Sequence, residues 1–325
     1  MERSNAFKSF TRALVSRILT MPESGVIASV VTLTIVFTLI DFNFISFQNI
    51  SGILVAASLG GIAAIGSAFL LITGEFDLSI GGNYGVSAII FAILVSETPD
   101  FTPLWFFVVL LIGAGVGFVN GIVSTKTKVP SFVATLGMSF FLRGLALFLT
   151  QGRAVIAPEV PFLSVLNGKL YNQLRTCVIW FAVVAVLFWF LLNKTRYGNW
   201  TYATGGNINV AKAMGVDGER VKIQNFVMGG MCASAAGMIF LARFNEAFSV
   251  AGSGIELEAI AAAVIGGTSL YGGFGSGIGA ALGAVLFMMI KVGLILIGAP
   301  AFWYRAYIGG ILVIASIINM WLFAK

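Results

Sequence analysis

Apolar residues follow one another in long, unbroken runs along this chain, separated by short polar connections. The runs lack the alternation of barrel strands, and most approach the about 20 residues that a membrane-spanning helix needs. The pattern therefore predicts an all-α integral membrane protein with about ten transmembrane helices. The expected spans are 26–42, 53–73, 78–95, 103–124, 130–150, 177–193, 222–243, 258–272, 277–298 and 303–323.

Glycine interrupts and shapes this pattern. The stretch from Glu75 to Ser79 is interpreted either as a cytoplasmic turn or as a break within the membrane, and the glycine-rich stretch from Gly266 to Gly277 as a point where a span divides into half-helices. Glycines at four-residue spacing predict helix faces that pack closely in lipid. They are Gly81 and Gly85, Gly113, Gly117 and Gly121, and Gly279 and Gly283.

Composition supports lipid as the main solvent, because only 10% of the residues are charged, against about 25% in soluble domains. The chain has no histidine, and its two cysteines, Cys177 and Cys232, lie inside apolar runs. This argues against a metal site, a histidine-based catalytic site and a disulfide framework. No cofactor is expected.

Basic residues set the expected orientation. Four of them lie within the first 25 residues, and with that segment in the cytoplasm twelve of the 19 fall on the cytoplasmic side. The pattern follows the positive-inside rule, and no nucleic acid partner is needed to explain the net charge. We expect a cytoplasmic segment 1–25, a first apolar run retained as a signal anchor, one transmembrane domain over 26–325, and both termini in the cytoplasm.

The longest cytoplasmic connection, 194–222, carries the most informative pattern. Glycines and Asn207 precede a short helical stretch from Ile208 to Met214, Gly215 ends it, and a turn follows. This is either an ordinary basic loop or a docking helix for a partner. Since no P-loop motif occurs, an ATPase would have to be a separate subunit. The segment resembles the coupling loop by which ABC importer permeases dock onto their ATPase subunits. That resemblance implies a coupling loop made of Gly205, Gly206, Asn207, Ala211, Met214, Gly215 and Val216, with Ala211 and Gly215 as small docking positions.

Several segments resemble, in the same order, those of the ribose-type permeases, within the branched-chain amino acid and monosaccharide superfamily of ABC importers. They read GEFDLSIG at 74–81, VPSFVATLG at 129–137 with LRG at 142–144, YATGGN at 202–207, and ELEAIAA at 256–262 running into VIGGTSL at 264–270. One departure is Glu75, where glycine is more common in the monosaccharide permeases; it indicates either a different substrate or a local salt bridge.

The resemblance implies a fold like the vitamin B12 permease, the type II importer arrangement, in a bacterial inner membrane. It also implies two permease copies, identical or different, two ABC ATPase subunits, a periplasmic or extracellular sugar-binding protein, and import of a monosaccharide, pentose or hexose. Branched-chain amino acids, nucleosides and a signalling furanose remain alternatives. The chain itself is expected to be no enzyme.

Polar residues near the breaks are candidates for the solute pathway, because broken helices expose backbone to cavities in transporters. They are Asp77, Asn83, Thr268, Ser269 and Tyr271. Asp77 has three interpretations: it caps the next helix, pairs with Lys126 or Lys128, or contacts sugar hydroxyls.

Charged residues within the outer halves of spans form a second group. Arg143 and Lys291 are the bases, and Glu256 and Glu258 are the expected counter-charges, so the sequence predicts an Arg143–glutamate pair.

A proton-coupled secondary transporter using Asp77 and Glu75 is the main alternative function outside the ABC class. It is disfavoured because both carboxylates stand near a loop and no acidic relay lies in mid-span. An intramembrane enzyme is disfavoured because no pair of catalytic groups meets on one helix face.

Overall fold

The computed structural model describes residues 23–127 and 129–298, and isolated positions beyond 299. The segment 1–22, Lys128 and most of the expected span 303–323 lie outside the described residues. The long helices are α2 (Ser24–Ile40), α3 (Phe47–Ile72), α4 (Ile80–Glu97), α5 (Thr102–Lys126), α6 (Ser131–Thr150), α8 (Thr176–Lys194), α11 (Gly218–Phe244) and α13 (Gly277–Leu296). Shorter elements connect them: the helices α7 (Pro161–Asn167), α9 (Arg196–Gly206), α10 (Ile208–Ala213) and α12 (Ile255–Ile265), the 3-10 turns η1 (Phe42–Ile45) and η2 (Pro99–Phe101), and the strands β1 (Val155–Ile156), β2 (Lys169–Tyr171), β3 (Leu174–Arg175) and β4 (Glu246–Ala247).

Within the described residues, seven helices are long and apolar enough to cross a membrane, namely all the long ones except α2, which has 17 residues. The protein is thus an all-helical, multi-pass membrane protein, apart from two small antiparallel ribbons, β1–β4 and β2–β3. The expected span 258–272 is wrong. Helix α12 has only 11 residues and ends at Ile265, because a run of glycines follows, among them Gly267 at φ +92°, a backbone conformation that other residues rarely adopt.

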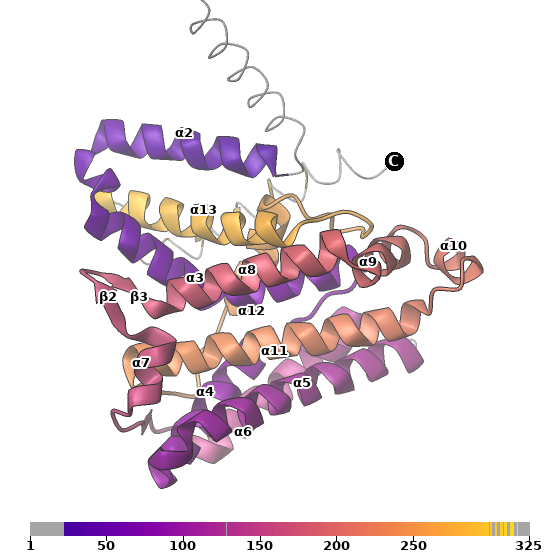
Figure 1. Cartoon of the computed structure of the whole chain (residues 1–325), viewed down its shortest axis with the longest axis horizontal. Coiled ribbons are helices and arrows are strands. Elements are labelled where there is room, and N and C mark those ends of the chain that lie inside the picture. Colours follow the sequence, from indigo (N-terminus) through magenta and orange to yellow (C-terminus); the bar gives the residue numbers. More distant parts are fainter. Residues whose placement is uncertain are drawn as a thin grey trace, which may run out of the picture.

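The long helices run side by side, and the connections gather at two ends (Figure 1). One end carries α9 and α10 and is called the α10 end. The other carries α7, β2 and β3 and is called the α7 end. Most of the hydrophobic window of α3, α4 and α11 is buried, whereas α5, α6 and α8 are largely exposed around them. The second group therefore presents its apolar side chains to lipid or to a partner.

Glycine faces bring the backbones of neighbouring helices into contact, as their four-residue spacing predicts. A Cβ on Gly117 of α5 would lie 2.1 Å from the carbonyl oxygen of Phe226 on α11, and one on Gly283 of α13 would lie 2.0 Å from the carbonyl oxygen of Ala262 on α12. No side chain fits at either point. These contacts hold α11 against α5 and α13 against α12 by close packing, the interaction that replaces the hydrophobic effect between helices in lipid.

The non-helical segment 73–79, which precedes α4, packs along the first turns of α6. The amide of Phe76 donates to Ser131 Oγ at 3.1 Å, and that of Leu78 donates to Thr135 Oγ1 at 3.0 Å. Gly82, in the first turn of α4, then packs against Leu142. The non-helical segment 73–79 therefore climbs the first turns of α6. Of the two interpretations of Glu75–Ser79, this geometry matches a break at membrane depth.

Candidate functional site

The connection 194–222 folds into two short helices rather than one. Asn207 caps α10, its side-chain oxygen accepting from the amides of Asn209 at 3.0 Å and Val210 at 3.2 Å. Helix α9, which precedes it, was missed. The hydroxyl of Thr195 accepts from Gly198 N at 3.3 Å, a capping contact of the kind that marks a helix start. A threonine ahead of α9 was the signal that the sequence offered.

Apolar side chains of α10 and its C-cap point to solvent. Ile208, Val210 and Met214 are exposed, with Met214 at 78%. Ala211 is only 1% exposed, so its assignment as a docking position is wrong: its side chain packs inward and cannot touch a partner. Gly215 has φ +83° with open space around it, which suits the end of a helix. Val210 and Met214 lie one turn apart and form the exposed apolar face.

Helix α9 packs directly on two other loops at the α10 end. A Cβ on Gly205 would lie 1.7 Å from the carbonyl oxygen of Ile72, where α3 ends. That carbonyl accepts from Gly273 N at 2.8 Å, in the glycine-rich loop 266–276. The hydroxyl of Tyr202 donates to the carbonyl oxygen of Gly275 at 2.8 Å. Displacement of α9 would therefore move both the end of α3 and the loop between α12 and α13.

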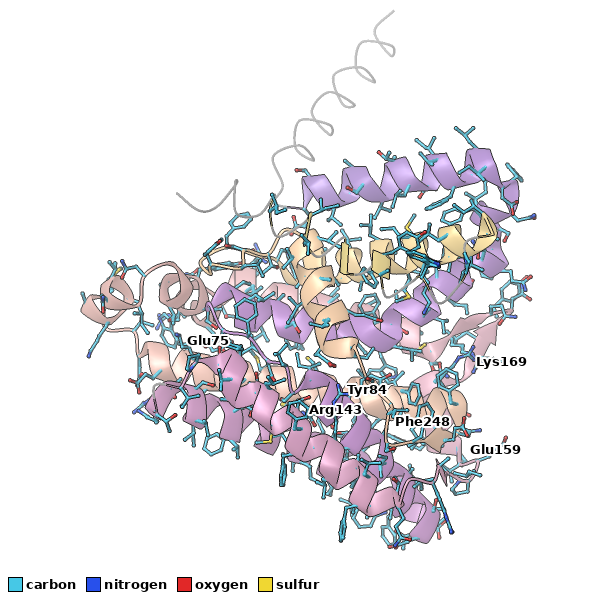
Figure 2. The ribbon with its side chains drawn as sticks, turned by 180° about the vertical axis from the view of Figure 1, so that it is seen from behind. Glu75, Tyr84, Arg143, Glu159, Lys169 and Phe248 are labelled. Carbon is cyan, nitrogen blue, oxygen red and sulfur yellow. The ribbon has the colours of Figure 1, made fainter. Side chains whose placement is uncertain are left out.

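Glu75, the residue that departs from the family pattern, forms an ion pair with Lys222 of α11. The two side chains are only 13% and 20% exposed, respectively. Of the two explanations offered by the sequence, the local salt bridge agrees with this contact (Figure 2 shows Glu75 toward the α10 end). The pair ties the segment 73–79 to α11, the helix that follows the connection 194–222.

Asp77 is buried at 3% exposure and holds the turn before α4. Its Oδ1 accepts from Ser79 N at 2.7 Å and from Ser79 Oγ at 2.6 Å. The residue at the cap of α4 is Ser79, so the first interpretation of Asp77 is wrong by two residues. Lys126 pairs with Glu219 instead, and Lys128 lies outside the described residues.

The other pathway candidates are packed by different helices. Asn83 is buried, and its side-chain amide donates to the carbonyl oxygens of Gly113 at 3.3 Å and Gly230 at 3.0 Å, which joins α4 to α5 and α11. Thr268 and Ser269 are buried in the loop 266–276, where Tyr271 is 57% exposed. Asn83 therefore holds helices together in this conformation.

Arg143 meets Glu256 across α6 and α12. Its Nη2 donates to Glu256 Oε1 at 2.8 Å, and its Nη1 donates to Ser253 Oγ at 3.2 Å. The second carboxylate oxygen, Oε2, is buried without a hydrogen-bond partner among the described residues. A Cβ on Gly81 would lie 1.9 Å from this oxygen. Glycine at this position therefore makes room for the carboxylate against α4.

The remaining two charges lie on α12 and α13. Glu258 is half-buried and lines a small cavity with Gly60 and Phe287, and Lys291 is half-buried on α13. In Figure 2, Arg143 and Tyr84 lie between Glu75 at one side and Glu159 and Lys169 at the other. The Arg143–Glu256 pair is thus in the interior of the bundle's length, away from both ends.

These features define a polytopic membrane transport protein: a bundle of apolar helices, discontinuous at α4 and α12, with an exposed helix at one end. The chain belongs to the family described as the permease component of the branched-chain amino acid transport system, whose model matches residues 49–316. This confirms the family that the sequence motifs indicate. As a permease component the chain is not an enzyme.

Relatives include the autoinducer 2 import system permease protein LsrC of Yersinia pestis (strain Pestoides F), 32% identical over 296 residues, with 91% of this chain and 84% of the relative covered. The protein of the same name from Photorhabdus luminescens is 34% identical over 283 residues, with 86% and 84% covered. No solved structure matches the chain.

Proposed function

We propose that this chain is the membrane subunit of an ATP-driven importer in a bacterial inner membrane and that it translocates a small furanose-type sugar. Autoinducer 2 is the first solute to test, and ribose is the second. The observation that supports this most directly is the similarity to permeases of autoinducer 2 import systems over most of both chains. Branched-chain amino acids and nucleosides stay as alternatives within the family.

The exposed apolar face of α10 supports a separate ATPase partner. Val210 is 55% exposed and Met214 is 78% exposed on a short helix that precedes α11. Exposed apolar side chains on a loop between membrane helices favour protein contact. Because α9 packs on the loops that end α3 and precede α13, a partner that moves α10 would act on the discontinuous helices. A second permease copy and an external binding protein complete the proposed complex.

Co-purification with the ATPase encoded beside this chain tests the docking face. We expect Met214→Asp to release the ATPase, because a carboxylate replaces the most exposed apolar side chain of the face. Asn209→Asp is the matched control, since Asn209 is exposed on the same helix but not on the Val210–Met214 face. Retention of the ATPase by Met214→Asp would refute α10 as the docking helix.

Uptake into cells tests the transport assignment. Uptake of labelled autoinducer 2 or ribose should require this chain, its ATPase and its binding protein together, and should persist when an uncoupler collapses the proton gradient. If wild-type chain never retains an ATPase, and uptake stops with the uncoupler while ignoring ATP, the proton-coupled alternative replaces this proposal.

A further inference from the structure

The Arg143–Glu256 pair lies at membrane depth. From the helical rise, the Cα of Arg143 is about 18 Å along α6 from Ser131 and about 10 Å from Thr150. Side chains on a helix tilt toward its N-terminus, so the guanidinium reaches back toward the middle of α6. Its partner Glu256 is in the first turn of α12. Both charges therefore occupy the depth of the hydrocarbon core, whose thickness is about 30 Å.

This polar cluster reaches the surface of the chain. The Arg143 side chain is 35% exposed, and Ser253, which accepts from it, is exposed as well. Ser253 belongs to the non-helical segment 248–254, and Arg143 lies beside it. This segment runs from β4 to touch α4, where a Cβ on Gly85 would lie 2.5 Å from the carbonyl oxygen of Ala251.

Lipid cannot be the environment of this surface. Irregular backbone at membrane depth is tolerated only where protein buries it or where it lines a water-filled cavity, and charged side chains there face the bundle interior or water. The exposed face at Ser253 therefore faces an aqueous space or a partner subunit, and not lipid. Glu256 Oε2 is buried without a hydrogen-bond partner among the described residues, so Arg143 and Ser253 are the residues of this cluster that a solute can reach.

We infer that Arg143 and Ser253, with Arg143 held by Glu256, form the wall of the solute pathway at membrane depth and hydrogen-bond a neutral, polyhydroxylated solute. The guanidinium donates its remaining N–H groups to solute oxygens, the Ser253 hydroxyl donates or accepts, and the Glu256 carboxylate holds the guanidinium in position. Because the guanidinium and the carboxylate neutralise each other, the wall favours an uncharged solute. This inference rests on the proposed function, in which the chain carries a sugar-like solute.

Thiol labelling of the assembled complex in lipid bilayers tests whether position 253 is exposed to water. Ser253→Cys should react with a charged, membrane-impermeant methanethiosulfonate reagent at least about tenfold faster than Phe141→Cys, because only a hydrated thiol forms the reactive thiolate. Phe141 lies two residues from Arg143, is 66% exposed and points to another side of α6. The native Cys177 and Cys232 are buried, and the unsubstituted chain gives their background. Equal, slow labelling of both variants would overturn the inference.

Exchanging the two charges distinguishes a contact with solute from an ion pair that only stabilises the packing of α6 on α12. Arg143→Glu combined with Glu256→Arg restores the ion pair, so assembly and basal ATPase activity should return. If Arg143 contacts solute, the KM for uptake should stay raised at least about tenfold in the exchanged protein, since acceptors replace the donors at position 143. Full recovery of uptake would show that the pair only fastens helices. Labelling needs no solute, so slow labelling of Ser253→Cys refutes this inference alone. Absence of furanose uptake by the unsubstituted complex refutes the proposed function.

Discussion

Replacement of Gly205 by alanine should disconnect α9 from the end of α3 and from the loop 266–276. The added Cβ would lie 1.7 Å from the carbonyl oxygen of Ile72 and 2.7 Å from the amide nitrogen of Gly273. Both are backbone atoms, and they are hydrogen-bonded to each other at 2.8 Å. Neither can rotate away as a flexible side chain would. Helix α9 must therefore shift outward, by roughly 1.5–2 Å to reach van der Waals distance.

The expected cost follows from two terms. Overpacking of a close contact costs about 1–3 kcal/mol. Weakening of the hydrogen bond from Gly273 to Ile72 adds about 0.5–1.5 kcal/mol. Together they give about 1.5–4.5 kcal/mol, which α9 can avoid only by losing its packing against the two loops.

Gly206→Ala is the matched control, because its Cβ meets nothing nearer than Gly273 Cα at 4.0 Å. Alanine at this helix position costs nothing by packing and can stabilise the helix by up to about 1 kcal/mol. Two measurements are made. Tryptophan fluorescence monitors thermal unfolding of the purified chain, and a transport assay on the complex measures uptake together with ATPase activity.

We expect Gly205→Ala to lower the unfolding midpoint and to lose transport while the bound ATPase still hydrolyses ATP. Gly206→Ala should match the unsubstituted chain in both. If the two variants behave alike, α9 does not transmit motion through this contact, and the reasoning is refuted.

Three further changes probe the discontinuous helices. Lys222→Met should destabilise the chain by about 2 kcal/mol, below the ~3–5 kcal/mol of a fully buried broken pair, because Glu75 is left without its counter-charge. Asn83→Leu should cost about 1–3 kcal/mol, since it removes two hydrogen bonds between buried helices. Asp77→Leu should cost a similar amount, because the turn before α4 loses the acceptor for two hydrogen bonds.

Each of these changes has a conservative counterpart, and thermal unfolding of the purified chain measures all of them. Adding Glu75→Gln to Lys222→Met should recover most of the lost stability, and failure to recover would mean that Lys222 acts by another contact. Asp77→Asn keeps an oxygen acceptor and should stay close to the unsubstituted chain. If Asn83→Leu unfolds at the same temperature as the unsubstituted chain, its bridge between helices contributes nothing.

Much of the architecture was predictable from local sequence. Long apolar runs located the seven helices that are long enough to span a membrane, because a helix in lipid satisfies its own backbone and needs only length and hydrophobicity. Four-residue glycine spacing likewise predicted close contacts, since such spacing lies on one helix face. Asn207 and Gly215 correctly located the start and the end of α10, because caps are local chemistry.

Predictions that depended on contacts between distant segments succeeded less often. The apolar run 258–272 looked like a span, yet its glycines let the chain turn back after α12, and hydropathy does not report backbone freedom. Ala211 looked like a surface residue, but packing buried it. The sequence predicted that Arg143 pairs with a glutamate. Only the tertiary structure selected Glu256 and placed the pair beside an exposed Ser253, because that choice depends on how α4, α6 and α12 cross, and crossing is decided by packing across the whole bundle.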